Sequence, residues 1–193
     1  MSMLLDKQGL ALTFLMAILI FAFGGLQYLG IMLVFFFSAI LVTKYEHQKK
    51  REMGIYEHER SWENVLSNGI MPTILAVFSN QAQYGFLGGF VGFQLGFIPY
   101  LASVAAVTAD KFASELGVLS GKPISLENLK PAKPGKSGAI SFLGLLVSLA
   151  GGSLIGGAAM FIFNINATQA LFIGIIGFIG SLIDSLFGIL EER

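Results

Sequence analysis

Six apolar stretches, separated by short turns or by two charged segments, dominate the pattern of this chain. They cover residues 10–24, 29–42, 65–79, 84–107, 139–163 and 167–190. Roughly 20 apolar residues let an α-helix cross the hydrocarbon core of a bilayer, so we interpret all six as transmembrane helices, the first three of them short. The pattern therefore predicts an all-α, polytopic membrane protein. Residues 1–193 would form a single domain, a bundle of about six transmembrane helices with glycine-rich interfaces.

Turn residues and prolines refine this picture. Gly24 and Gly25 separate the first two stretches, and Asn164 and Asn166 the last two, which predicts a helical hairpin at each end of the chain. The third stretch contains Pro72, so it is either a kinked span or a half-membrane helix.

Composition agrees with a membrane protein and excludes several functions. Of the 193 residues, 54% are hydrophobic and 12% charged, and the mean hydropathy is +0.74. No cysteine is present, which excludes disulfides, thiolate metal sites and cysteine nucleophiles. The net charge is zero, which argues against a nucleic-acid partner because phosphate-backbone binding needs a basic excess.

The distribution of basic residues predicts an orientation. The polar segments 44–63 and 111–137 each hold five of the twelve Lys and Arg residues. Because basic residues near span ends stay on the cytoplasmic side, both segments are expected there. With six spans, both termini fall on that side too. We therefore expect a multi-pass protein of the cell membrane with cytoplasmic N- and C-termini.

Small residues at helical spacing point two acids toward the bundle. In the fourth stretch they are Gly92, Gly96, Pro99, Ser103 and Ala106, and the same stripe continues to Asp110 and Ser114. In the last stretch, Gly177, Ser181 and Gly188 share a stripe with Asp184. Carboxylates in a membrane are costly and by default mark a functional site with a partner cation. A purely structural polar contact is the alternative for Asp184.

A third acid, Glu115, follows Asp110 by five residues, about 140° around a helix. The two cannot share one ligand unless the helix breaks between them, and Gly117 supplies a nearby helix end. Asp110, Glu115 and Asp184 are the candidate catalytic and Mg²⁺-binding residues. His47 and His58 lie in the first charged segment without a metal-ligand partner, and we interpret them as solvated surface residues.

A basic loop rich in proline and glycine precedes the fifth stretch. Its candidate phosphate-binding residues are Lys130, Lys133, Gly135, Lys136, Ser137 and Gly138, and a helix is expected to begin near Ser137. Loop amides, a helix N-terminus and lysines suit a phosphate group. The Gly-Lys-Ser triplet resembles the end of a Walker A motif, but position 130 is Lys and no strand precedes it, so we reject a P-loop. The alternative is a turn whose lysines meet anionic lipid head groups.

Four segments resemble the integral membrane family that includes plant phytyl-phosphate kinase and many uncharacterised prokaryotic membrane proteins. They are residues 60–69 (RSWENVLSNG), 108–117 (TADKFASELG), 133–141 and 180–188 (GSLIDSLFG). The second is the most specific. The chain departs from the family pattern at Lys111, where a threonine is expected after the aspartate, and at the single Gly138, where members tend to have two glycines.

The resemblance implies a membrane-embedded kinase that transfers a phosphoryl group from a nucleoside triphosphate to a phytyl or polyprenyl monophosphate. CTP is the donor that the resemblance favours, and the departures leave ATP as the alternative. In this interpretation Arg60 and Asn68 also line the site, and the isoprenoid tail of the acceptor lies between the glycine-faced helices. Membrane lipids surround the bundle. A lipid nucleotidyltransferase, a small cation- or proton-coupled transporter, and a lipid-binding protein without catalysis are the alternatives.

Overall fold

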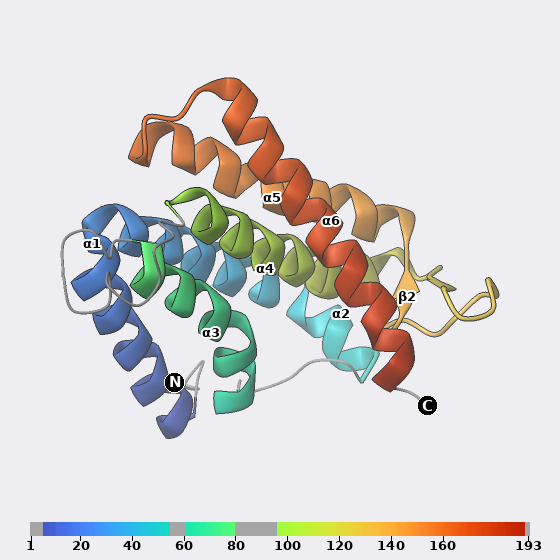
Figure 1. The fold of residues 1–193 in the computed structure, drawn as a ribbon. Coiled ribbons are helices and arrows are strands. Elements are labelled where there is room, and N and C mark those ends of the chain that lie inside the picture. The colour runs from blue at the N-terminus through green and yellow to red at the C-terminus, as the bar shows by residue number, and fades with distance from the viewer. Residues whose placement is uncertain (1–5, 55–60, 80–95, 192–193) are drawn as a thin grey trace.

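The computed structural model describes residues 6–54, 61–79 and 96–191. Its helices are α1 (Lys7–Lys44), α2 (His47–Glu52), α3 (Trp62–Ser79), α4 (Ile98–Leu116), α5 (Phe142–Ile162) and α6 (Ala167–Glu191). A 3₁₀ turn, η1 (Gly117–Ser120), and two short antiparallel strands, β1 (Ile124–Ser125) and β2 (Ala139–Ile140), connect α4 to α5. The predicted all-α class is confirmed (Figure 1).

Predicted stretches and observed helices agree best at the C-terminal end, where α5 and α6 occupy 139–163 and 167–190 almost entirely. The stretch 84–107 lies partly outside the described residues. Helix α4 continues past it to Leu116, so Asp110 and Glu115 lie on helix. Among the described helices, α1, α5 and α6 are long and apolar enough to cross a membrane.

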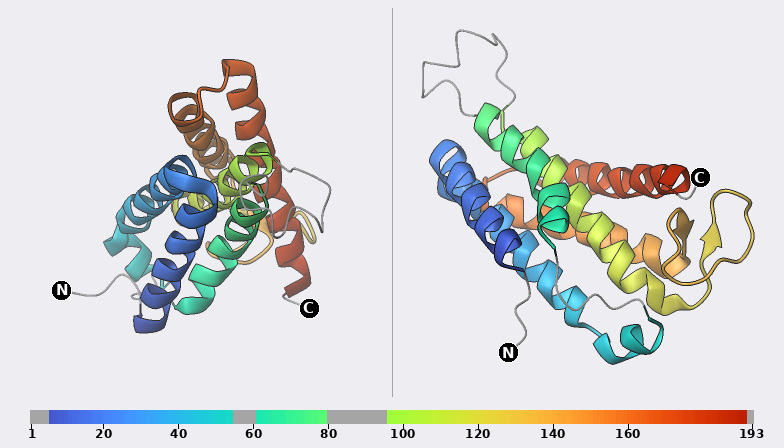
Figure 2. Two further views of the ribbon diagram at one scale, coloured as in Figure 1. Left: turned by 60° about the vertical axis from the view of Figure 1, so that its left-hand side comes forward. Right: turned by 90° about the horizontal axis from the view of Figure 1, so that it is seen from below.

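Helix α1 contains both arms of the first predicted hairpin. Its 38 residues are interrupted at Gly25, whose φ of 78° and ψ of −169° are not helical. That region of backbone space is essentially restricted to glycine. Figures 1 and 2 show the second arm turning back from this bend toward the end of the bundle where the first arm began. The described chain thus has six helical segments beside the short α2.

Gly25→Ala is expected to lower the free energy of unfolding by about 1–3 kcal/mol, because alanine rarely adopts this backbone conformation. Thermal unfolding in detergent measures the change. Gly157→Ala is the matched control, since Gly157 lies within α5 with open space around it. The control should keep or slightly raise the melting temperature, because alanine favours helix. Equal losses in both variants would contradict the role assigned to Gly25.

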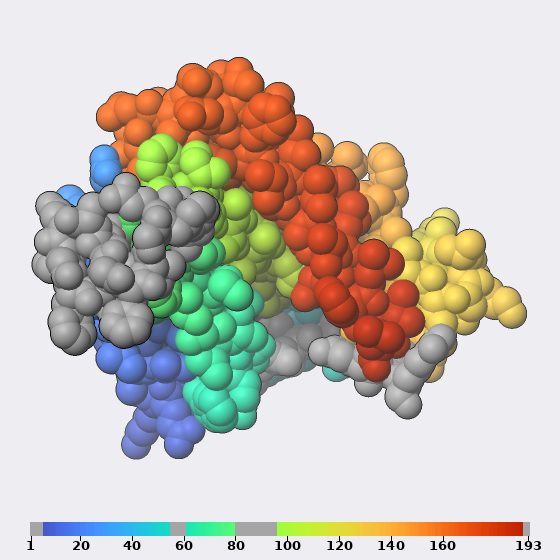
Figure 3. Space-filling view, in the orientation of Figure 1, coloured from blue at the N-terminus to red at the C-terminus, as the bar shows by residue number. Residues whose placement is uncertain are grey.

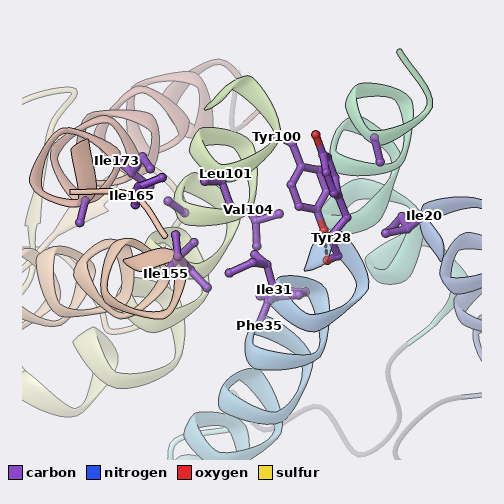
Figure 4. Close-up of a cluster of buried hydrophobic side chains, with 14 of the residues drawn as sticks. Ile20, Tyr28, Ile31, Phe35, Tyr100, Leu101, Val104, Ile155, Ile165 and Ile173 are labelled. Atoms are coloured by element: carbon purple, nitrogen blue, oxygen red, sulfur yellow. Dashed lines mark hydrogen bonds between the residues drawn. The ribbon is translucent and has the colours of Figure 1, made fainter. Parts of the chain in front are cut away.

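Helix α4 occupies the centre and contacts α1, α3, α5 and α6. The core lies where these helices meet and includes Ile31, Leu101, Val104, Ile155 and Ile173 (Figure 4). At the Gly25 end, the Tyr100 hydroxyl donates a 2.7 Å hydrogen bond to the carbonyl oxygen of Tyr28. Helix α2, strand β2 and the end of α6 lie at the opposite end of the bundle (Figure 1).

Glycines allow α5 to approach both of its neighbours closely. A Cβ added at Gly151 would lie 2.9 Å from the carbonyl oxygen of Thr108 on α4. One added at Gly152 would lie 2.5 Å from the carbonyl oxygen of Gly174 on α6. On the third side, a Cβ at Gly177 would lie 2.8 Å from Ala105. Because their backbones are in contact here, α4, α5 and α6 pack tightly against one another at this depth in the bundle.

Candidate functional site

A cavity of about 620 Å³ lies at the charged end of the bundle, on the side of the glycine contacts that faces the polar segments. The end of α4, the start of α5 and the end of α6 form its walls. The loop before β2 and the corner between α1 and α2 complete it, contributing Lys136 and Lys50 among other residues. Segments distant in sequence therefore meet in one polar space.

Asp110 from α4 and Asp184 from α6 both line the cavity and interact directly through their carboxyl groups. A hydrogen bond between two carboxyl groups requires a proton on one of them. A cation can take the place of that proton, because it neutralises two carboxylates held at close range. The stripes of small residues predicted that both acids face the bundle; both line the cavity, and Asp184 is exposed.

Glu115 is held by lysines rather than by the aspartates. Its carboxylate lies 3.0 Å from Lys50 Nζ and 2.6 Å from Lys111 Nζ, and it accepts a 3.1 Å hydrogen bond from the Thr43 hydroxyl. Burial raises the pKa of Glu115, but the lysines outweigh burial and lower this pKa to about 2. Glu115 therefore stays ionised in an ion-pair cluster that forms one wall of the cavity.

The predicted three-carboxylate metal site is not assembled in this form. Helix α4 runs without a break through Asp110 and Glu115, so the two side chains diverge. Within the described residues, no group of three His, Cys, Asp or Glu side chains is arranged to hold a metal ion. The paired aspartates fit a Mg²⁺ held by two protein carboxylates with phosphate and water oxygens completing the shell. Metal binding itself stays a prediction.

Lys50 was not recognised from the sequence as a site residue. It is 2% exposed and donates hydrogen bonds to the carbonyl oxygens of Val42 (2.8 Å) and Thr43 (3.2 Å). These bonds attach α2 to the end of α1. The sequence does not single out Lys50, because it stands in a run of three basic residues, Lys49, Lys50 and Arg51. Only the fold determines which of the three side chains is buried.

The predicted phosphate loop is brought to the cavity in part. Gly135, Lys136, Ser137 and Gly138 line it, whereas Lys130 and Lys133 are exposed and do not. Gly135 and Gly138 have φ of 82° and 68°. A Cβ at Gly138 would lie 2.8 Å from the Ile189 side chain, so the loop packs against α6. Figure 3 shows the segment that contains this loop, in yellow, beside the red C-terminal half of α6.

The expectation that a helix begins near Ser137 is wrong. Helix α5 begins at Phe142 and is capped by Ser141, whose hydroxyl accepts from Gly144 N and donates to the Gly117 carbonyl, both at 3.0 Å. The preceding residues pair instead with β1. The start of α5 is thus displaced by five residues from the predicted position and is capped by its own serine, so the loop amides and Lys136 are the phosphate-binding groups that this segment offers to the cavity.

The remaining residues singled out in the sequence are Asn68, Arg60 and the two histidines. Asn68 does not line it, whereas Asn64, about one turn earlier on α3, does. Arg60 and His58 lie outside the described residues. His47 is exposed on α2, in agreement with its interpretation as a surface residue.

The described helices and their charged cavity define a multi-pass integral membrane protein. The chain belongs to the integral membrane protein family DUF92, whose family pattern matches residues 1–193. This confirms the kind of family that the sequence motifs indicated.

Relatives occur in archaea, plants and cyanobacteria. The chain is 35% identical over 191 residues to the uncharacterised membrane protein MJ0933 of Methanocaldococcus jannaschii, covering 98% of this chain and 75% of that protein. It is 30% identical to protein PGR of Arabidopsis thaliana (95% and 70% covered) and 26% identical to membrane protein sll0875 of Synechocystis (96% and 71%). No solved structure matches the chain.

Proposed function

We propose that this protein is a membrane-embedded kinase that transfers a phosphoryl group from a nucleoside triphosphate to an isoprenoid monophosphate. One observation carries the proposal. A single cavity combines an interacting pair of aspartates with a glycine-rich loop that bears a lysine, and these groups come from three separate parts of the chain. Carboxylates for a divalent cation and cationic donors for phosphate are the groups that phosphoryl transfer requires.

Each wall of the cavity has a role in this proposal. Asp110 and Asp184 would hold Mg²⁺, which when bound neutralises charge on the phosphates. Lys136 and the amides of Gly135–Gly138 would bind the donor phosphates, and Lys111 also lines the cavity. The acceptor phosphate is already ionised, so no general base is assigned.

The close backbone contacts at Gly151, Gly152 and Gly177 favour an enzyme over a transporter. The residues that line the cavity on α5 end at Ser148, and Gly151 and Gly152 on the next turn contact α4 and α6 through backbone atoms. A transport pathway would have to separate these backbones. A cavity open at one end suits a reaction between a soluble donor and a lipid head group.

The direct test is incubation of purified protein in detergent with Mg²⁺, either CTP or ATP, and a short-chain isoprenyl phosphate. Mass spectrometry of the product separates the proposals: a kinase adds one phosphoryl group, and a nucleotidyltransferase adds a nucleotide. An unchanged acceptor with both donors would remove the enzyme proposal. A difference in product yield between the reactions with CTP and with ATP identifies the donor. CTP is the first donor to test.

We propose that both polar segments and both termini face the cytoplasm. The chain has no cysteine, so single cysteines report topology without background. Lys49→Cys and Asn128→Cys are expected to react with a membrane-impermeant thiol reagent only from the cytoplasmic side. Thr168→Cys, exposed at the opposite end of the bundle, should react only from outside. Labelling of the first two from opposite sides would contradict both the topology and the shared cavity.

Gly135→Ala is expected to weaken binding of the Mg²⁺-nucleotide at least about tenfold without a change in charge. Its φ of 82° disfavours alanine, and the backbone must approach the phosphate closely. Gly121→Ala is the matched control: Gly121 has a φ of 66°, open space around it and no place in the cavity lining. Titration calorimetry measures both affinities. If the two variants bind alike, the loop only meets lipid head groups.

A further inference from the structure

Ser148 on α5 has a buried hydroxyl that the described contacts leave unsatisfied. Ser148 is 2% exposed. Among the described residues, its hydroxyl oxygen is the buried side-chain polar atom that has no hydrogen-bond partner. It also lines the cavity. Buried polar groups are nearly always paired, so an orphan at a cavity wall indicates a partner that arrives with a ligand.

Helical serines and threonines usually pair with their own helix, and this chain follows that rule elsewhere. Thr108 on α4 donates to the Val104 carbonyl at 2.7 Å, and Ser185 on α6 donates to the Ser181 carbonyl at 3.0 Å. The carbonyl of Gly144 lies one turn before Ser148 and offers the same bond. The Ser148 hydroxyl does not make it, although this pairing is the local default.

The position of Ser148 places it at the inner end of the cavity. The residues of α5 that line the cavity run from Ser141 at the cap through Leu145 to Ser148. On the next turn, Gly151 and Gly152 close the space by backbone contact with α4 and α6. A ligand that fills the cavity to its end therefore reaches Ser148. A lysine at this depth would be costly to bury, whereas a hydroxyl is a neutral donor.

We propose that the Ser148 hydroxyl donates a hydrogen bond to a phosphate oxygen of the ligand, and so marks a binding subsite at the inner end of the cavity. The lysine-bearing walls select an anionic group, and phosphate oxygens are strong acceptors for a hydroxyl. This inference rests on the proposed function, because that function supplies phosphate to the cavity. The phosphate can belong to the donor or to the lipid acceptor, and the test below separates the two.

The test compares Ser148→Ala with Ser38→Ala. Ser38 is also a buried helical serine, but it lies outside the cavity lining and its hydroxyl donates to the Phe35 carbonyl at 2.9 Å. Ser148→Ala should keep or raise the melting temperature of the unliganded protein, because it removes an unpaired group, whereas Ser38→Ala should lower it slightly. Ser148→Ala should weaken phosphate binding about tenfold or more, and Ser38→Ala should not.

Two probes identify the source of the phosphate: Mg²⁺-pyrophosphate for the donor and a short-chain isoprenyl monophosphate for the acceptor. Weaker binding of either one to Ser148→Ala supports the subsite and assigns its phosphate. Ser148→Cys keeps the volume, loses most of the donor strength and should show the same weakening. If wild-type protein binds the probes and both variants bind them equally well, the inference fails and the proposed function stands. If wild type binds neither probe, both fail.

Discussion

Asp110→Asn and Asp184→Asn are each expected to lower phosphoryl transfer at least about 100-fold while the protein remains folded. Asparagine has nearly the shape of aspartate but lacks the charge that holds a divalent cation. Because the two carboxyl groups interact directly, each substitution also disrupts the pair. The rate of product formation, followed by mass spectrometry at saturating donor, measures the effect.

Under the proposed function, Mg²⁺ should raise the melting temperature of the wild type, since a cation that binds the folded state stabilises it, and both variants should lose this effect. Without Mg²⁺, neither variant should be less stable than wild type, because one of two neighbouring carboxylates has been neutralised. Glu63→Gln, on an exposed position of α3 outside the cavity, is the control and should behave as wild type in both measurements. Full activity in either aspartate variant would remove that residue from the site.

The second large effect concerns the ion-pair cluster. Glu115→Gln is expected to cost about 3 kcal/mol of unfolding free energy or more, because it leaves the buried ammonium of Lys50 without its counter-charge. Lys50→Met should cost clearly less, since Glu115 keeps Lys111 and Thr43 as partners. Denaturant unfolding in detergent measures both variants, and Lys49→Met, at an exposed position on α2, is the control for the lysine change.

The double variant Lys50→Met with Glu115→Gln should recover most of the loss, because it removes the buried charge together with its partner. Equal costs for the two single variants, or simple additivity in the double, would contradict the cluster. The pKa of Glu115 near 2, below its ordinary value of 4.5, sets the pH dependence. Its contribution is complete above pH 4.5 and disappears as pH falls toward 2, so wild type and Glu115→Gln should converge only in that acid range.

Hydropathy and helical spacing anticipated the parts of the fold that depend on local sequence. Apolar length placed α5 and α6, and the Gly24–Gly25 pair marked the bend in α1. The stripes of small residues predicted that Asp110 and Asp184 face the bundle, because side chains three and four residues apart share a helix face whatever the tertiary structure. These predictions needed no knowledge of which helices touch.

The remaining features depend on contacts between distant segments. Glu115 was assigned to a metal because no local signal connects it with Lys50, which comes from a short helix 65 residues earlier. Helix α5 begins at Phe142 and not near Ser137, because the intervening residues Ala139 and Ile140 pair with β1. A strand of two residues has too short a pattern to be predicted from sequence. Ser148 resembled the other small residues of a glycine-rich helix, and only its missing partner distinguishes it.

The pairing of Asp110 with Asp184 also has a consequence for biosynthesis. The first acid lies on the central helix α4, and the second lies on α6, which follows α4 and α5 in the chain. Chains are made from the N-terminus, so a nascent polypeptide contains only half of the pair until α6 has been synthesised. Any function that needs both acids can therefore begin only after α6 has entered the membrane and docked against α4.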